Sequence, residues 1–143
     1  MTGKILSICI SKGVGSAKQP VETAELRAGY GIVGDGHAET VRPVSIAMAE
    51  TAAAFAKEHG LEASPGDFAE NILVGGIDLK ILKPGDRIFL GPAVLELVQI
   101  GKETRPDHYS FHGYRLLPAH GYFCKVLEGG TIKPGDVCRF DKD

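Results

Sequence analysis

The stretch Pro84-Gly85-Asp86-Arg87-Ile88-Phe89-Leu90 joins a tight turn directly to a short apolar run. Proline fixes φ and glycine tolerates positive φ, so the pair is typical of a turn, while the run that follows suits a β-strand. The same arrangement returns at Pro134-Gly135-Asp136 before the run 137–140, and the turn alone occurs at Pro65-Gly66-Asp67. Repeated turns that lead into short strands predict a mainly β fold.

Other segments add further strands to this prediction. Leu6, Ile8 and Ile10 alternate with small residues, which predicts a half-buried strand with Cys9 on its other face. The ranges 21–26 and 44–46 also suit strands. Residues 94–100 are almost continuously apolar, as expected of a strand that is buried on both sides.

One segment, residues 48–59, predicts a helix. It is rich in alanine, places Met48, Ala52 and Phe55 at helical spacing and is followed by Gly60, a typical helix stop. We interpret its apolar stripe as core. Many short strands with one main helix and short helical turns favour a closed or nearly closed β-barrel, in a single domain that spans residues 1–143.

Composition narrows the classes of function. The chain has 143 residues, 16 Lys and Arg against 18 Asp and Glu, and a net charge of -2, with no basic run of the kind that nucleic-acid binding needs. No apolar run approaches the roughly 20 residues that span a bilayer, and the three scattered cysteines form no disulfide framework. We expect a cytoplasmic protein without nucleic-acid or membrane partners.

The glycine-rich stretch Gly31-Ile32-Val33-Gly34-Asp35-Gly36-His37 presents a carboxylate and an imidazole together on a bend. Asp35 and His37 could bind a metal, move a proton or hydrogen-bond each other. A second glycine-rich segment, residues 12–20, contains Lys12 and Lys18 and could bind an anion. Because it lacks the spacing of known phosphate-binding loops, we favour a mobile loop there.

Two further segments place polar side chains at the ends of predicted strands. Around the turn at 65–67, Glu70 and Asn71 could point into the mouth of a cavity, or Asp67 and Asn71 could simply stabilise turns. We prefer the structural role for Asp67, and for Asn71 both stay open. Beyond residue 100, Lys102 and Arg105 could bind a phosphate.

Histidine and cysteine give two weaker candidate sites. His108 and His112 have the i, i+4 spacing of a helical metal site, but their neighbours disfavour a helix, and a third ligand would have to come from His37, Asp35 or His120. Cys124, four residues after His120, is a candidate nucleophile within an apolar segment. An inert buried thiol and ordinary loop histidines are the alternatives that we favour.

Several of these segments together resemble the MOSC domain, the family named for the C-terminal domain of molybdenum-cofactor sulfurases. The similar segments follow the order of the family and cover nearly the whole chain: 31–37, 42–45, 65–72, 99–103, 118–123, 126–130 and 134–136. The resemblance implies a β-barrel with a pocket for a molybdenum-pterin species or a related role in sulfur transfer.

One position departs from that resemblance. In small stand-alone members the segment reads Gly-Lys-Glu-Cys-His, and its cysteine is the proposed sulfur carrier or molybdenum ligand. Here Thr104 and Arg105 stand at those positions, and a further cysteine is replaced near Arg115. A hydroxyl cannot carry sulfane sulfur, so sulfur transfer through this position is in doubt. We also expect no pyridoxal phosphate in this chain, so sulfur would have to come from a partner.

Three hypotheses follow. In the first, the barrel binds a molybdenum-pterin cofactor or a related anionic molecule, and a sulfur donor or a molybdoenzyme is the partner. The residues that we expect at this site are Asp35, His37, Arg42, Ser45, Glu70, Asn71, Lys102, Thr104 and Arg105. In the second, Cys124 makes the protein a thiol-dependent enzyme. In the third, His37 with His108 and His112 forms a metal or proton-transfer site.

Overall fold

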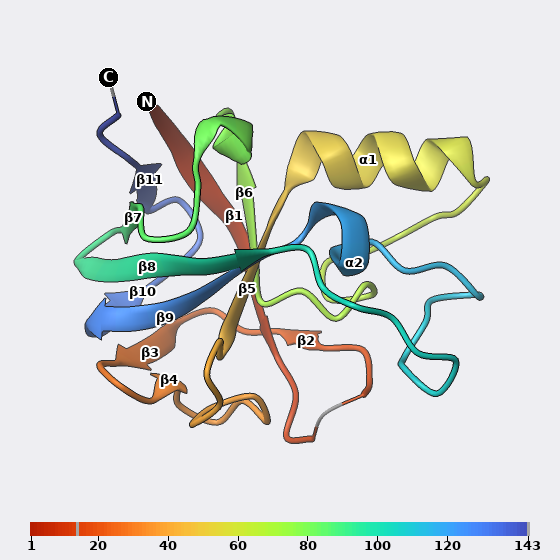
Figure 1. Cartoon of the computed structure of the whole chain (residues 1–143), viewed down its shortest axis with the longest axis horizontal. Coiled ribbons are helices and arrows are strands. Elements are labelled where there is room, and N and C mark those ends of the chain that lie inside the picture. The colour runs from red at the N-terminus through yellow and green to blue at the C-terminus, as the bar shows by residue number, and fades with distance from the viewer. Residues whose placement is uncertain (14, 143) are drawn as a thin grey trace.

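The computed structural model of the chain describes residues 1–13 and 15–142. Seven strands form a closed barrel in the order β11, β7, β8, β9, β5, β6 and β1, and β1 pairs with β11 to complete the ring (Figure 1). Neighbouring strands are antiparallel except β5 and β6, which are parallel. The strands of the barrel are β1 Thr2–Ile10, β5 Val44–Met48, β6 Ile72–Gly75, β7 Arg87–Leu90, β8 Ala93–Ile100, β9 Tyr122–Glu128 and β11 Val137–Arg139. The predicted β-barrel is confirmed.

Shorter elements surround the barrel. Strand β2 (Gln19–Pro20) pairs with β1, and a small separate sheet has the order β10 (Gly130–Ile132), β3 (Ala24–Arg27) and β4 (Gly31–Ile32). Helix α1 (Ala49–Glu58) confirms the predicted helix, and the short helical turns are η1 (Leu79–Ile81) and α2 (Leu117–His120). No helix among the described residues is long and apolar enough to cross a membrane.

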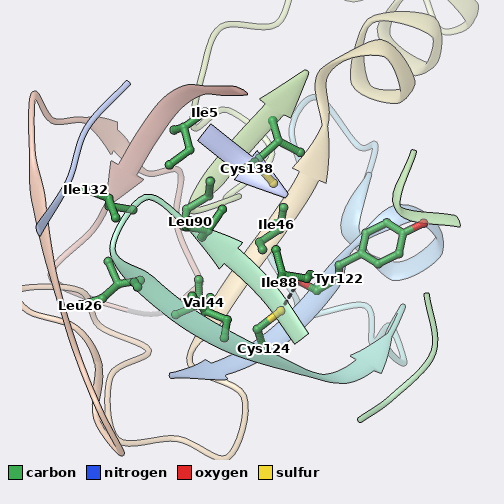
Figure 2. Close-up of a cluster of buried hydrophobic side chains, with 14 of the residues drawn as sticks. Ile5, Leu26, Val44, Ile46, Ile88, Leu90, Tyr122, Cys124, Ile132 and Cys138 are labelled. Carbon is green, nitrogen blue, oxygen red and sulfur yellow. Dashed lines mark hydrogen bonds between the residues drawn. The ribbon is translucent and has the colours of Figure 1, made fainter. Parts of the chain in front are cut away.

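The main hydrophobic core fills the barrel. Figure 2 shows aliphatic side chains from several strands around Cys124 and Cys138, and both thiols are buried. A second cluster, which includes Phe68 and Phe123, connects the barrel to the helices, and the Phe55 ring of α1 lies 5.5 Å from that of Phe68. The apolar stripe of α1 is therefore core, as predicted.

The prediction for strand β1 was wrong in one respect. The register of β1 against β6 shifts between Ile5 and Ser7, which is a β-bulge, so Ile5 and Ile8 face the core whereas Leu6 is 51% exposed. Strict alternation cannot anticipate the extra residue of a bulge. Cys9 lies on the face opposite Ile8, as predicted, but this face is also buried, because the turn at Gly66 covers it.

Two other strand predictions need correction. The predicted strand 21–26 begins only at Ala24, since Val21 uses its amide to bond the carbonyl of Ile8 at 2.8 Å. Strand β8 is not buried on both sides along its length, because Glu96 is half-buried and Ile100 is 42% exposed. Apolar residues at the open end of a barrel strand need not be covered.

Candidate ligand-binding site

A cavity of about 380 Å³ lies beside the barrel and is lined by residues from the beginnings of β5 and β9, from helix α2 and from the loops that follow β4 and β8. Its volume suits a small organic molecule, since ligand cavities in proteins commonly begin at about 300 Å³. Half of its lining residues are cationic, imidazole or aromatic, and Asp107 is the one acidic residue among the lining residues that the structure describes; the cationic, imidazole and aromatic residues are Arg42, Lys102, Arg115, His37, His108, Phe68, Tyr109, Tyr114 and Phe123.

Two cations flank one aromatic ring in this cavity. The guanidinium carbon of Arg42 lies 5.4 Å and Lys102 Nζ 5.6 Å from the centroid of the Phe123 ring. Arg42 also donates a hydrogen bond to the side-chain oxygen of Gln99. Among the described residues, neither cation forms an ion pair with a carboxylate. Two positive charges and an aromatic surface are thus available to a ligand.

Several positive charges lie near Lys102 and affect its pKa. Burial lowers the pKa of Lys102, and the charges of Arg42, Lys18 and Arg115 lower it further. Both effects disfavour the charged lysine in the empty cavity, and a bound anion would counteract them. The site therefore favours an anionic ligand.

Arg115 holds the loop that borders the cavity. Its guanidinium donates to the carbonyl oxygens of Tyr109 at 3.2 Å, His108 at 2.9 Å and Pro106 at 3.4 Å. The hydroxyl of Tyr109 in turn donates to the carbonyl of Asp67 at 2.6 Å. These bonds attach the 106–115 segment to the turn on the opposite side of the cavity.

The predicted glycine bend forms another wall. Gly34 has φ +90, and a Cβ on Gly36 would lie 2.6 Å from backbone atoms of Gly13, so both positions require glycine. The Asp35 carboxylate is buried and accepts hydrogen bonds from Lys18 Nζ at 2.7 Å and from the His37 amide at 3.1 Å. His37 itself lines the cavity.

The protonation state of Asp35 follows from these contacts. Burial alone would raise its pKa, but hydrogen bonds from His37 and Lys18, the Lys18 charge and the Ser11 amide together lower the pKa well below its ordinary value. Asp35 is thus a permanent carboxylate whose charge Lys18 balances. Lys18, which we expected in a mobile loop rather than in an anion-binding one, is buried in this ion pair. Val14 of the same loop lies outside the described residues.

Asn71 and Ser45 connect three strands at the base of the cavity. Asn71 Oδ1 accepts from the Ser45 amide at 3.0 Å, its Nδ2 donates to the Cys9 carbonyl at 3.0 Å, and Ser45 Oγ accepts from the Asn71 amide at 2.9 Å. Both side chains line the cavity, although Asn71 is only 1% exposed. These are not the local turn bonds of the structural alternative for Asn71, because they reach residues that are 26 and 62 positions away.

Glu70 and Asp67 are occupied within their own turn. Glu70 accepts hydrogen bonds from the amides of Gly66 at 2.8 Å and Phe68 at 3.2 Å, and it does not line the cavity. Burial raises the pKa of Glu70, which the hydrogen bonds only partly offset. The Asp67 carboxylate accepts from the Ser64 amide at 2.7 Å, the structural role that we preferred for it.

Comparison with known proteins identifies the family of this chain. A family model, described as the MOSC domain, matches residues 33–105, about half of the chain, including residues 33–37 of the glycine bend, Arg42 and Lys102. The chain belongs to the MOSC-domain family. No curated protein matches it significantly.

Solved structures share the fold of this MOSC domain. The YuaD protein from Bacillus subtilis superposes with a TM-score of 0.75 at 23% identity, covering 99% of this chain and 98% of that one. YiiM from Geobacillus stearothermophilus gives a TM-score of 0.75 at 20% identity, over 98% of this chain and 75% of that one. YiiM from Escherichia coli gives 0.70 at 18% identity, over 98% and 70% of the two chains. At these identities the likeness shows the fold alone.

Thr104 and Arg105 lie apart from the main cavity of this MOSC domain. Both are exposed, and neither lines the cavity. Arg105 borders a second hollow of about 340 Å³, together with Arg42, Gln99, Glu103 and His108. The position at which the resemblance places a reactive cysteine is therefore a solvent-exposed loop in this chain.

The two paired histidines do not lie on a helix. His108 is exposed and borders both hollows, whereas His112 is exposed, has φ +50 and sits in a turn closed by the bridge between Phe111 and Tyr114. Over residues 1–13 and 15–142, no three histidine, cysteine or acidic side chains are arranged to hold a metal ion. The i, i+4 spacing gives no shared helical face here.

None of the cysteines in this MOSC domain lines the cavity. Cys124 is buried in the barrel, where burial and the nearby Cys138 raise its pKa. Burial likewise raises the pKa of Cys138 to about 12, and burial together with the charge of Glu70 raises that of Cys9 to about 12. Cys124 is neither accessible nor readily ionised, so the thiol-enzyme alternative has no support in the structure.

Sequence reasoning missed the aromatic part of the site. Phe123, Phe68 and Tyr114 were not among the predicted site residues, and Arg115 was noted only for the cysteine that it replaces. Phe123 could have been found from the segment 118–123, which carries part of the MOSC resemblance and ends on Phe123 at the start of a strand. Its position opposite Arg42 arises from the pairing of β5 with β9, which the sequence does not reveal.

Proposed function

We propose that this MOSC domain binds the phosphorylated pterin of the molybdenum cofactor in the cavity beside Phe123. The observation that supports the proposal most strongly is the pair Arg42 and Lys102, two partly buried cations that lie 5.4 Å and 5.6 Å from the centroid of the Phe123 ring and have no carboxylate partner among the described residues. A phosphate needs such cations, and a planar heterocycle needs an aromatic face.

The residues fit the organic part of the cofactor better than its metal. Arg42 and Lys102 would bind the phosphate, the ring would stack on the aromatic lining, and His37 would hydrogen-bond the ligand at the opposite wall. A molybdenum centre, when bound, supplies oxygen-atom and sulfur chemistry. The described lining offers no thiolate to it, since Cys9, Cys124 and Cys138 are all buried elsewhere.

This distribution of groups favours binding and handling over catalysis. A thiolate is the soft group that could accept sulfur, and Thr104 is an exposed hydroxyl outside the cavity. Sulfuration of a bound cofactor would need sulfur from a donor protein, and delivery would need a molybdoenzyme as acceptor. We infer that the domain holds or presents the ligand to such a partner.

The decisive experiment is a titration with metal-free molybdopterin, followed by pterin fluorescence and calorimetry. Dephosphorylated molybdopterin tests the role of the phosphate, and adenosine monophosphate tests whether any aromatic phosphate binds equally well. We expect the phosphorylated pterin to bind most tightly. Binding should also weaken as salt is raised, because two cations meet the anion.

Arg42→Gln and Lys102→Gln are the matched variants. Each removes a charged hydrogen-bond donor, worth about 1.5–3 kcal/mol, and should weaken binding by about 10- to 100-fold. Arg139→Gln is the control, since Arg139 also lies over a phenylalanine ring, that of Phe89 at 4.2 Å, but outside the cavity. Absence of binding to the unmodified protein, or equal affinity in all three variants, would contradict the proposal.

A further inference from the structure

Lys18 makes an unusual set of contacts for a lysine. It is only 1% exposed, and its Nζ lies 2.7 Å from Asp35 Oδ1, 3.4 Å from Ser11 Oγ and 3.1 Å from His37 Nδ1. Its backbone is fixed as well, because its amide donates to the carbonyl of Gly66 at 2.9 Å. The side chain is thus held between the buried carboxylate and the imidazole.

These contacts determine which ring nitrogen of His37 bears a proton. An ammonium group has three donors and no acceptor, so Nδ1 of His37 must accept the bond from Lys18. The alternative partner for Nδ1 is too distant, since Asp35 Oδ2 lies 3.7 Å away and bonds the His37 amide instead. The ring proton is then on Nε2.

The ionic state of the pair supports this assignment. Asp35 accepts hydrogen bonds from Lys18, the Ser11 amide and the His37 amide, so both of its carboxylate oxygens already have donors. Lys18 Nζ forms an ion pair with this carboxylate at 2.7 Å. The imidazole therefore faces a donor on its Nδ1 side.

From this geometry we propose that Lys18 is a positioning residue that holds His37 as the Nε2–H tautomer, so that the imidazole donates a hydrogen bond to an acceptor oxygen of the ligand in the cavity. His37 lines the cavity with its side chain 37% exposed, whereas Lys18 does not reach the lining. The class of ligand, a pterin with a ring carbonyl, rests on the proposed function. The tautomer itself depends only on Lys18.

The consequence is a division of roles around the ligand. Arg42 and Lys102 provide charge for a phosphate, while His37 selects for an acceptor atom on the ring. A ligand that presents a donor to His37 would leave two donors facing each other, which costs binding energy. Lys18 thus affects specificity without touching the ligand.

Nuclear magnetic resonance of histidine-labelled protein without ligand tests the tautomer directly. We expect long-range correlations that show Nε2 protonated and Nδ1 unprotonated for His37. A protonated Nδ1 in the neutral ring of the unmodified protein would overturn the proposal, whatever the variants do.

The variant Lys18→Met/Asp35→Asn removes both charges, so it avoids leaving one buried charge alone. Its His37 should become a mixture of tautomers, and Lys12→Met, which changes an exposed lysine of the same loop, should leave the spectrum unchanged. Unchanged tautomers in the double variant would also overturn the proposal.

Saturation of the unmodified protein with metal-free molybdopterin should shift the resonance of the His37 Nε2 proton. Binding without that shift would refute the hydrogen bond from His37 to the ligand. Absence of binding would refute the proposed function alone.

Discussion

At the scale of single residues, Asp35 connects three parts of the chain. Its carboxylate bonds Lys18 of the loop before β2, the Ser11 amide at the end of β1 and the His37 amide within its own bend. A carboxylate that is buried needs such partners, since removing one member of a buried pair leaves an uncompensated charge. The cavity wall at His37 therefore depends on Asp35.

Asp35→Asn should destabilise the protein by about 3–5 kcal/mol at pH 7, because Lys18 then loses its counter-charge. The folded-state pKa of Asp35 is lowered, so its stabilising contribution is complete above the unfolded-state value near 3.8 and is lost as the pH falls below it. Urea unfolding across this pH range should show the difference between the two proteins narrowing in acid.

The control for this prediction is Asp141→Asn. Asp141 pairs with Arg139 at 2.9 Å, but its side chain is 78% exposed, and such surface pairs contribute at most about 1 kcal/mol. A difference between wild type and Asp35→Asn that stayed constant down to strongly acidic pH would contradict the assigned ion pair.

The sequence predicts several residues that line the cavity, but it does not predict all of the hydrogen bonds that the candidate residues make. Arg42, Lys102 and His37 were predicted as binding residues, and all three line one cavity. Glu70 was predicted beside them, yet its carboxylate turns back to two amides of its own turn. Such local hydrogen bonds depend on backbone angles that composition does not specify.

At the scale of elements, the three Pro-Gly-Asp turns have the same internal bonds. In each, the aspartate amide donates to the carbonyl three residues earlier, and its carboxylate accepts from that residue's amide, as Asp86 does with Lys83 at 2.9 Å. Their surroundings differ. A Cβ on Gly66 would lie 2.0 Å from the Lys18 carbonyl oxygen, whereas Gly85 and Gly135 have nothing within 4 Å.

Gly85→Ala and Gly135→Ala should each cost about 1–2 kcal/mol, the penalty of a side chain at positive φ. Gly66→Ala also places a side chain at positive φ, and its Cβ would in addition displace Lys18. We therefore expect a clearly larger loss in the free energy of unfolding, measured by chemical denaturation. It should also weaken ligand binding, unlike the other two. Equal costs for all three substitutions would show that the contact with Lys18 is unimportant.

Helices and strands could be predicted from the sequence where the local spacing of apolar residues and the turn residues determine them. The helix 49–58 and the strands after the second and third turns follow from spacing and turn chemistry. The bulge in β1 and the parallel pairing of β5 with β6 do not, because both depend on which strands become neighbours when the barrel closes. The cavity is formed by these long-range pairings, so its shape could not be predicted.

At the scale of the whole molecule, the three cysteines report on the integrity of the barrel. Cys9 lies on β1, Cys124 on β9 and Cys138 on β11, and all are fully buried. Cys124 and Cys138 belong to the main core, while Cys9 lies beneath the turn at Gly66. A reagent reaches them only when the fold opens.

Native protein should therefore leave its thiols almost unreacted with a disulfide reagent at neutral pH, whereas denatured protein reacts fully. We expect Cys9 to react first, by local opening of the turn, and Cys124 and Cys138 only at the rate of global unfolding. Mass spectrometry of partially labelled protein gives this order.

Thr104→Cys is the matched control for that experiment, because residue 104 is exposed. It should add one rapidly reacting thiol without altering the other three. Fast labelling of Cys124 in the native protein would contradict the buried position and would restore the thiol-enzyme alternative.

The pairing of the first strand with the last has a consequence for synthesis. Residues 2–4 pair with residues 137–139, and the amino group of Met1 bonds the carbonyl of Phe140 across a separation of 139 residues. Such a contact has a high entropic cost and becomes available only when almost all of these residues have left the ribosome. Until then β1 and β7 have exposed edges, and nascent chains that wait in this state are the ones most exposed to aggregation.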